Sequence, residues 1–348
     1  MNSRKGQSSR FYAWLIPVVV IIAIVVVVAV FMYMNRAPSY PPPPPGWQII
    51  RPPNVTMALA EQDDYIWVGA TDGVFAVDRH TGALLSDPSD GWPSFSYVED
   101  LLVDEEGSLW LAHRAGLSRC KEGNCLTYTS DDGLLPGVVK SLLKDSDGNL
   151  WIGTEEGAAR FNGVDWQGFS LDDGLGAIPV DSIFEDENGI LWFGSDSVND
   201  AGLSRFDGKN WQTFSTDDGL AHNRITDISQ DSSGTLWVAT GMGYNGGASG
   251  LNNGTWSTLS KDDGMAGDRI RSIFEDNEGR LWFGSEYDGS AVFDGRDFYV
   301  FTPHDGLAGW EVMEMLQDSD SIYWLATESG VSRIGSIDAV MEEKQRQG

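Results

Sequence analysis

Short runs of alternating apolar and polar residues, separated by turns rich in glycine and aspartate, repeat along most of the chain. A representative unit reads as four strands, at residues 180–185, 190–195, 202–206 and 210–215. The first two strands are joined by Asp186–Gly189 and the last two by Asp207-Gly208. Because aspartate and glycine favour tight hairpin turns, each unit predicts a four-stranded antiparallel sheet.

The unit repeats every 41 to 45 residues, and a tryptophan on its second strand marks each copy. These tryptophans are Trp67, Trp110, Trp151, Trp192, Trp237, Trp282 and Trp324. A period of this length without helical periodicity is typical of β-propeller blades rather than of a helical solenoid. The count therefore predicts an all-β fold, a seven-bladed β-propeller of four-stranded blades.

The last unit supplies only three strands, at 312–317, 322–327 and 330–334. The missing fourth strand is expected near the beginning of the repeats, where Gly46–Ile50 resembles the outer strands that contain Trp166 and Trp211. We therefore predict that Trp47–Ile50 is the outer strand of the seventh blade. Such a strand joins the first blade to the last and leaves no open edge between them.

The segment Ser272–Ser285 is a typical copy of the repeat, with a turn at Asp276–Gly279 followed by Leu281-Trp282. This pattern resembles the two-component regulator propeller repeat, and the resemblance covers about residues 46–334. It implies an extracytoplasmic sensor domain of the kind attached to bacterial membrane histidine kinases. Because only a short charged tail follows the repeats, we expect no fused kinase and a separate membrane partner for any signal.

Phe11–Met34 contains no charged residue and is long enough for a helix that crosses a bilayer. It also exceeds the apolar core of an ordinary signal peptide, so we expect an uncleaved signal anchor. Three basic residues precede this span and one follows it. The positive-inside rule then predicts a cytoplasmic N-terminus and a propeller on the other side of the cell membrane.

These segments divide the chain into five parts. They are a cytoplasmic tail at 1–10, a transmembrane signal-anchor helix at 11–34, a proline-rich linker at 35–45, the propeller at 46–335 and a C-terminal tail at 336–348. The run Pro41–Pro45 predicts a stiff polyproline II spacer.

The chain carries a net charge of −29, and the acidic residues lie after the predicted span. An acidic body repels phosphate backbones, which argues against nucleic acid as a partner. The excess of acid has two interpretations. It keeps the protein soluble, or it attracts cations and cationic partners.

Cys120 and Cys125 are the two cysteines, and they flank a short turn between the third and fourth strands of the second unit. Positions that face each other across a hairpin meet the geometry of a disulfide. A disulfide here agrees with an extracytoplasmic location, and two free thiols are the alternative.

The linkers between units contain Asp-Gly or Asp-Asp-Gly, which ring symmetry places on one face. They are at 90–91, 131–133, 172–174, 217–219, 262–264 and 305–306. They are either turns that the crossing between blades requires or a ring of carboxylates that binds cations. The turns between first and second strands lack the ligand spacing of a calcium loop. We expect neither a metal site nor a cofactor, and the four histidines have no metal or catalytic spacing.

Two connections between second and third strands are longer than the others, at Asp196–Ala201 and at Gly241–Gly250, and they share a face with the linkers. We interpret Gly241–Gly250 as a flexible loop, and drift in surface loops is the alternative explanation of the features on this face. Aromatic and polar side chains on this face suit a polar ligand with apolar parts. The candidate ligand-binding residues are Asn199, Asp200, His222, Arg224, Tyr244, Asn245, Arg269, Tyr287, Asp288 and Trp310.

Three functions follow from these patterns. The first is a membrane-anchored sensory or ligand-binding propeller that recognises a glycan, a peptide or a protein. The second is a lyase or hydrolase that acts on a polymer, for which no catalytic motif is present. The third is a scaffold of the cell envelope, for which a broad apolar patch would be the sign.

Overall fold

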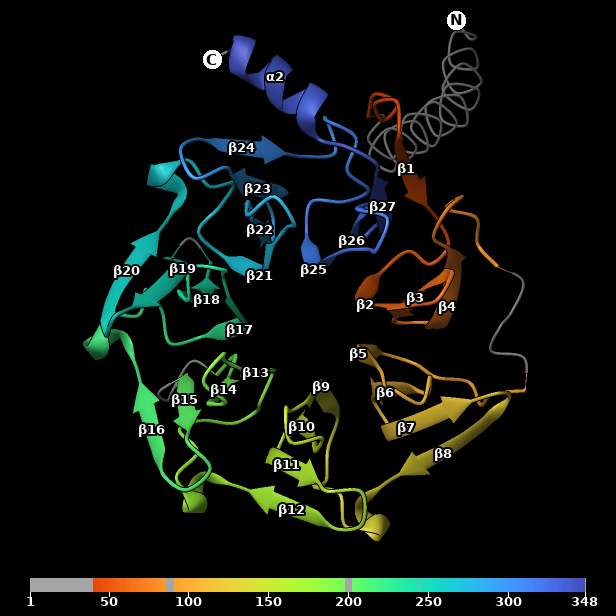
Figure 1. Cartoon of the computed structure of the whole chain (residues 1–348), viewed down its shortest axis with the longest axis vertical. Coiled ribbons are helices and arrows are strands. Elements are labelled where there is room, and N and C mark those ends of the chain that lie inside the picture. Colours follow the sequence, from red (N-terminus) through yellow and green to blue (C-terminus); the bar gives the residue numbers. More distant parts are fainter. Residues whose placement is uncertain (1–39, 86–90, 198–201, 244, 348) are drawn as a thin grey trace, which may run out of the picture. The chain divides into compact units, whose positions relative to one another are not determined.

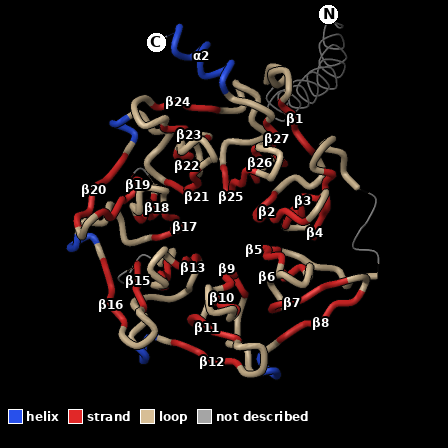
Figure 2. The backbone as a smooth tube through the Cα atoms, in the orientation of Figure 1, coloured by secondary structure: helices blue, strands red, loops and turns tan. Residues whose placement is uncertain are grey.

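Seven antiparallel sheets surround a central axis in the computed structural model, which describes residues 40–85, 91–197, 202–243 and 245–347 (Figure 1). Residues 42–348 form one compact unit. The first strand of each sheet lies nearest the axis and the last lies at the rim, as the backbone trace also shows (Figure 2). The predicted seven-bladed all-β propeller is therefore confirmed.

Blade 1 contains β2 (Thr56–Gln62), β3 (Tyr65–Ala70) and β4 (Gly73–Asp78). Blade 2 contains β5 (Val98–Val103), β6 (Leu109–His113), β7 (Gly116–Lys121) and β8 (Asn124–Tyr128). Blade 3 contains β9 (Val139–Lys144), β10 (Leu150–Thr154), β11 (Gly157–Phe161) and β12 (Trp166–Phe169). Blade 4 contains β13 (Ser182–Glu185), β14 (Leu191–Gly194), β15 (Leu203–Phe206) and β16 (Trp211–Phe214).

Blade 5 contains β17 (Ile225–Gln230), β18 (Leu236–Met242), β19 (Asn245–Asn252) and β20 (Thr255–Leu259). Blade 6 contains β21 (Ile270–Glu275), β22 (Leu281–Ser285), β23 (Ser290–Phe293) and β24 (Phe298–Phe301). Blade 7 contains β25 (Val312–Gln317), β26 (Tyr323–Thr327), β27 (Gly330–Ile334) and β1 (Trp47–Ile50). Six sheets have four strands, and in blade 1 a single bridge from Leu84 to Val77 extends the three described strands.

The seventh blade is closed by β1, as the sequence predicts. β1 pairs antiparallel with β27, with Trp47 opposite Ile334 and Ile50 opposite Val331. The strand comes from the beginning of the repeats and its partner from the end, so their pairing holds the ring shut. Within the described residues no helix is long and apolar enough to cross a membrane, and the span predicted at 11–34 lies outside them.

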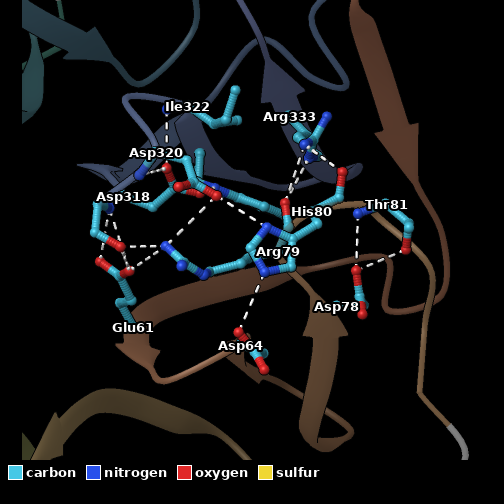
Figure 3. Close-up of polar contacts among 12 residues, drawn as sticks. Glu61, Asp64, Asp78, Arg79, His80, Thr81, Asp318, Asp320, Ile322 and Arg333 are labelled. Atoms are coloured by element: carbon cyan, nitrogen blue, oxygen red, sulfur yellow. Dashed lines mark hydrogen bonds and ion pairs between the residues drawn. The ribbon is translucent and has the colours of Figure 1, made fainter.

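Polar side chains reinforce the seam between blades 7 and 1 (Figure 3). Arg79, which follows β4, contacts Glu61 of β2 at 2.9 Å. His80 contacts Asp320, in the turn between β25 and β26, at 2.9 Å. Arg333 of β27 donates to the backbone oxygen of His80 at 2.8 Å. The first and last blades are therefore joined by side chains as well as by β1.

One hydrogen bond recurs in every blade and fixes the first hairpin against the core. In six blades the aspartate that directly follows the first strand accepts from the indole Nε1–H of the tryptophan six residues later, at 2.8–3.0 Å. In blade 1, Gln62 takes this role with Trp67 at 2.7 Å. The other aspartate oxygen accepts from the turn's backbone, as Asp276 does from the N–H groups of Glu278 and Arg280. The buried tryptophan rings thus have defined positions.

The Asp-Asp-Gly linkers are capped turns. Four of them form short 3₁₀ helices: η1 (Ser130–Asp132), η2 (Leu171–Asp173), η3 (Thr216–Asp218) and η4 (Lys261–Asp263). The second aspartate of each accepts the backbone N–H of the residue before the helix, at 2.8–2.9 Å. The glycine that follows has a positive φ in each case. The geometry supports the interpretation as turns, with one aspartate of each pair committed to the cap.

The same glycines pack under an aromatic residue of the next blade's outer strand. The pairs are Gly133 with Trp166, Gly174 with Trp211, Gly219 with Trp256 and Gly264 with Phe298. A β-carbon would strain the backbone at all four sites, and at three of them it would lie only 3.0–3.1 Å from the aromatic residue, which would have to shift slightly. After the last blade, α2 (Asp338–Gln347) packs beside blade 6, where Lys344 contacts Asp305 at 2.6 Å.

Replacing Asp318 with alanine is expected to destabilise the propeller by about 3 kcal/mol, because one buried indole N–H and two partly buried backbone N–H groups lose their acceptor. Asp318 is 1% exposed and accepts from the Trp324 indole and from the backbone of Asp320 and Ile322. Urea unfolding followed by tryptophan fluorescence measures the loss. Asp207→Ala is the control, because Asp207 accepts two exposed backbone N–H groups in the turn between β15 and β16. This change should lower the free energy of unfolding by about 1 kcal/mol. Equal losses would contradict a special role for the buried bond.

Gly219→Ala should cost roughly 1–3 kcal/mol more than Gly208→Ala. Both glycines have a positive φ, +116° and +87°, so the backbone penalty is shared. A β-carbon at Gly219 would lie 3.0 Å from Cβ of Trp256, whereas one at Gly208 would have no neighbour within 4 Å. Thermal melts of the two variants measure the difference. The same melting temperature in both would show that the linker yields to the added methyl group.

Candidate functional site

The first strands of the blades line a central channel with side chains of very different character. In six blades the pairing of the first two strands skips one residue, and blade 4 has Asp181 at that place, directly before β13. Together with Asp196, these residues line a cavity of about 230 Å³. The seven are Met57, Glu99, Lys140, Asp181, Thr226, Arg271 and Met313. In six blades a bulge therefore directs a variable side chain toward the channel.

In six of the blades the next residue of the first strand lines an adjoining cavity of about 290 Å³, which shares residues with the first. In blades 2, 5 and 7 it is a carboxylate that accepts a backbone N–H of the following blade. Asp100 accepts from Leu142 at 2.7 Å, and Asp227 accepts from Ile273 at 2.8 Å. Glu314 accepts from the backbone N–H of Leu59 at 2.7 Å. These carboxylates connect neighbouring blades, a role that the sequence analysis missed.

Burial raises the pKa of Asp100 and of Asp227 to about 7, although each accepts two backbone N–H groups. Burial also raises the pKa of Glu314 well above its usual range. The loss of hydration outweighs the hydrogen bonds at all three groups. The three carboxyl groups repel one another across the channel, so the centre of the ring favours their protonated forms.

A belt of ion pairs lies at the channel mouth, on the face that carries the linkers and the second-to-third-strand connections. Arg224, in the linker before β17, pairs with Asp196, which follows β14. Arg269 pairs with Glu286, and Arg271 contacts Glu311 at 2.9 Å. Deeper in the channel, Lys140 contacts Asp181 at 3.1 Å. The arginines and lysine of this belt are therefore bound by carboxylates of the protein itself.

A cleft of about 410 Å³ opens on the same face, between the loop after β22 and the linker before β25. It is lined by Glu286, Tyr287, Trp310, Glu311 and Glu328. Tyr287 is 58% exposed, and the guanidinium group of Arg269 lies 5.9 Å from the centre of its ring. Glu328 accepts the backbone N–H groups of Trp310 and Glu311 at 3.0 and 2.9 Å, which fixes the opposite wall.

The structure brings three of the predicted site residues together, since Tyr287 and Trp310 line this cleft and Arg269 lies over the ring of Tyr287. His222 and Arg224 lie on the linker before β17, two linkers away from the one that carries Trp310, and the ring of His222 accepts the backbone N–H of Arg224 at 3.0 Å. Burial lowers the pKa of His222.

The remaining predicted residues lie elsewhere. Asp288 contacts Lys261 at 3.8 Å and does not line the cleft. Asn199, Asp200 and Tyr244 lie outside the described residues.

The prediction of a flexible loop at Gly241–Gly250 is wrong. β18 continues to Met242 and β19 begins at Asn245, so most of this segment is a paired hairpin. Asn245 pairs with Met242 as a strand residue. Its glycines mimic a loop sequence, but Gly246 and Gly247 are packed closely against the backbone of other segments, which only glycine permits.

Glu286, Glu311 and Glu328 were not among the predicted site residues, and neither was Arg271. Glu286, Glu328 and Glu155 come directly after the second strand of their blades, and Asp196 comes two residues after the end of β14. An acidic residue recurs near this position in blades 3, 4, 6 and 7, and this recurrence in the sequence could have predicted the belt of ion pairs.

Cys120 and Cys125 form a disulfide, as predicted, between directly opposed positions of β7 and β8. Among the described residues, no group of three or more His, Cys, Asp or Glu side chains is arranged to hold a metal ion. His113 is buried in blade 2 and hydrogen-bonds to Ser118 at 2.9 Å. Its other ring nitrogen accepts the backbone N–H of Ala115, so both nitrogens of the neutral ring have hydrogen-bond partners within the fold.

Comparison with known proteins identifies the repeat. The sequence profile of the two component regulator propeller matches residues 133–156, 174–197, 219–242 and 264–287. These are the stretches from the linker glycine to the end of the second strand in four successive blades. No curated protein matches the chain.

Solved structures share the fold at low sequence identity. The extracellular domain assigned to the hybrid two component system BT3049 of B. thetaiotaomicron is 18% identical, with a TM-score of 0.73. The match covers 87% of this chain but 42% of that one, so the chain spans less than half of its length. Virginiamycin B lyase from Staphylococcus aureus, in complex with quinupristin, is 13% identical with a TM-score of 0.63, over 82% of this chain and 98% of that one.

PorZ, a surface component of the type-IX secretion system of Porphyromonas gingivalis, is also similar. It is 14% identical, with a TM-score of 0.61, over 80% of this chain and 46% of that one. At these identities the likenesses establish the propeller architecture and nothing about the ligand.

His113 should make the protein less stable as the pH falls. Burial lowers its pKa in the folded state to about 4, against an ordinary value of 6.5. Below pH 6.5 the His113 side chain is protonated in the unfolded chain but stays neutral in the folded protein. The free energy of unfolding therefore decreases as the pH drops from 6.5 toward 4. The contribution of His113 between pH 7 and pH 5 should be a loss of about 2 kcal/mol. The raised pKa values of Asp100 and Asp227 act in the opposite direction over this range. The His113 contribution is therefore measured as the difference in pH dependence between the unmodified protein and His113→Gln, by urea unfolding at both pH values.

Proposed function

Because this chain belongs to the two-component regulator propeller family, we propose that it is a sensory propeller anchored in the cell membrane. In this proposal the propeller lies outside the cytoplasm and binds a glycan, a peptide or a protein at the channel mouth. Residues 11–34 anchor it, and a separate membrane protein receives the signal. The disulfide between Cys120 and Cys125 supports an oxidising location.

The observation that carries the proposal is the cleft beside the charged belt. Ligand sites combine a concave surface, aromatic walls and a few fixed polar groups, and this cleft has all three. Its polar groups are held by the scaffold, since Arg269 pairs with Glu286 and Glu328 fixes the backbone of the opposite wall. Such a preorganised site loses little entropy when a ligand binds.

The beginning of the propeller touches the linker that carries one wall of the cleft. Pro43 and Pro44 pack against Gly306, leaving no room for a β-carbon there. Arg51, directly after β1, donates to the backbone oxygen of Ala308 at 2.8 Å. Both contacts lie on the linker that leads to Trp310. These contacts support a route by which a change in the linker on ligand binding is transmitted to the segment that precedes β1.

A thermal-shift screen of the full chain in detergent tests the proposal. Panels of glycans, peptides and divalent cations should yield one class that stabilises the protein, by about 2.7 kcal/mol at a hundred times Kd. Tyr287→Ala should abolish the shift, whereas Val164→Ala, at an exposed position that does not line the cleft, should leave it unchanged. The anchor is tested by membrane fractionation in the same expression strain. The full chain should stay in membranes washed at alkaline pH, whereas a chain without residues 1–36 should not.

Two results would refute the binding proposal. One is the absence of any shift in protein that is shown to be folded. The other is a shift that survives Tyr287→Ala, which would place the ligand elsewhere.

A further inference from the structure

The cleft between blades 6 and 7 has walls of two kinds. Tyr287 and Trp310 provide aromatic surface from loops of adjacent blades, while Glu286, Glu311 and Glu328 provide carboxylates. Its volume of about 410 Å³ lies at the lower end of the range of roughly 300–1,000 Å³ that is usual for ligand pockets. The cleft therefore suits a side chain or a small group rather than a folded surface.

The aromatic walls are held in place. The exposed ring of Tyr287 faces Arg269 at 5.9 Å, and the backbone N–H of Tyr287 donates to Ser285 at 3.4 Å. The ring of Trp310 meets His304 edge to face at 5.7 Å. Rigid rings of this kind bind cations through their faces, and the protein's own Arg269 already makes this contact with Tyr287.

The charges that line the cleft are all negative. The two arginines nearest to it, Arg269 and Arg271, contact Glu286 and Glu311 without lining the cleft themselves. Three carboxylates against two guanidinium groups leave one net negative charge, in a protein with a net charge of −29. An anionic ligand would be repelled, and a neutral one would gain no Coulombic attraction from this arrangement.

We propose that the cleft binds the side chain of a lysine or arginine in an extended basic peptide segment of a partner protein. The alkyl stem of the side chain lies between Tyr287 and Trp310, and its charged end faces the carboxylates. The inference rests on the proposed function, because it names the ligand class for the same site. Charge complementarity favours this occupant over a glycan.

Isothermal titration of the full chain in detergent with three short peptides tests this inference. The probes are acetyl-Ala-Lys-Ala-Lys-Ala-amide and the same peptide with norleucine or glutamate in place of lysine. Norleucine keeps the apolar stem and removes the charge. The lysine peptide should bind at least tenfold more tightly than the norleucine peptide, and raising the salt from 50 to 300 mM should weaken it severalfold. The glutamate peptide should not bind.

Tyr287→Leu should weaken the lysine peptide about three- to tenfold by removing the ring. Tyr97→Leu is the matched control, because Tyr97 is 44% exposed and carries Arg114 over its ring at 5.3 Å, away from the cleft. Circular dichroism establishes that both variants are folded. Equal binding of the lysine and norleucine peptides, or equal effects of the two variants, would overturn the inference.

Maltohexaose and cellohexaose are titrated in parallel to separate the two proposals. A glycan that binds and is lost with Tyr287→Leu, while the lysine peptide does not bind, would keep the sensory site and overturn its assignment to a basic peptide. Failure of every ligand class in the wider screen would overturn both.

Discussion

The hydrogen bond from an indole N–H to the carboxylate that directly follows the preceding strand is the interaction on which this propeller depends. It joins the turn, the inner hairpin and the core in one place, since the same carboxylate also binds the turn's backbone. The tryptophan ring then packs against the next blade, as Trp151 does with Val180 and Phe193. A local turn and a contact between blades are therefore fixed by the same pair of residues. This explains why the period of the sequence is so clear.

The repeat explains why the fold could be predicted and also where prediction ended. Tryptophan spacing, hairpin turns and the missing strand at 46–50 were sufficient for seven blades and their closure, because each is a local or repeated feature. Gly241–Gly250 was misread because glycine serves close backbone packing in a sheet as well as a loop. The carboxylates Asp100, Asp227 and Glu314 were missed because their partners lie in the next blade, some forty residues or more away.

The candidate site was predicted in part for a related reason. Aromatic residues such as Tyr287 and Trp310 are conspicuous as departures from the repeat, and ring symmetry places their loops on one face. Their surroundings are a property of the assembled ring. Glu311 is positioned by Arg271 of the neighbouring blade, and Glu286 meets Arg269 across its own blade. Ion pairs of this kind join linkers and strands only in the assembled ring. They have no fixed separation along the chain, so the sequence alone does not predict them.

The channel and the cleft use carboxylates for different purposes, and this difference decides which one is suited to a ligand. Asp227 accepts two backbone N–H groups from two blades, so its oxygens hold the ring together and burial drives it toward the protonated form. Occupying those oxygens with a ligand would open the contact between blades. At the cleft, the carboxylates are paired with arginines near the surface and stand beside an exposed ring. Glu286 and Glu311 bind arginine side chains rather than the backbone of a neighbouring blade, so an incoming cation can share one of them without opening a backbone contact between blades. The deepest acidic groups are therefore structural, and the chemistry available for recognition lies at the rim.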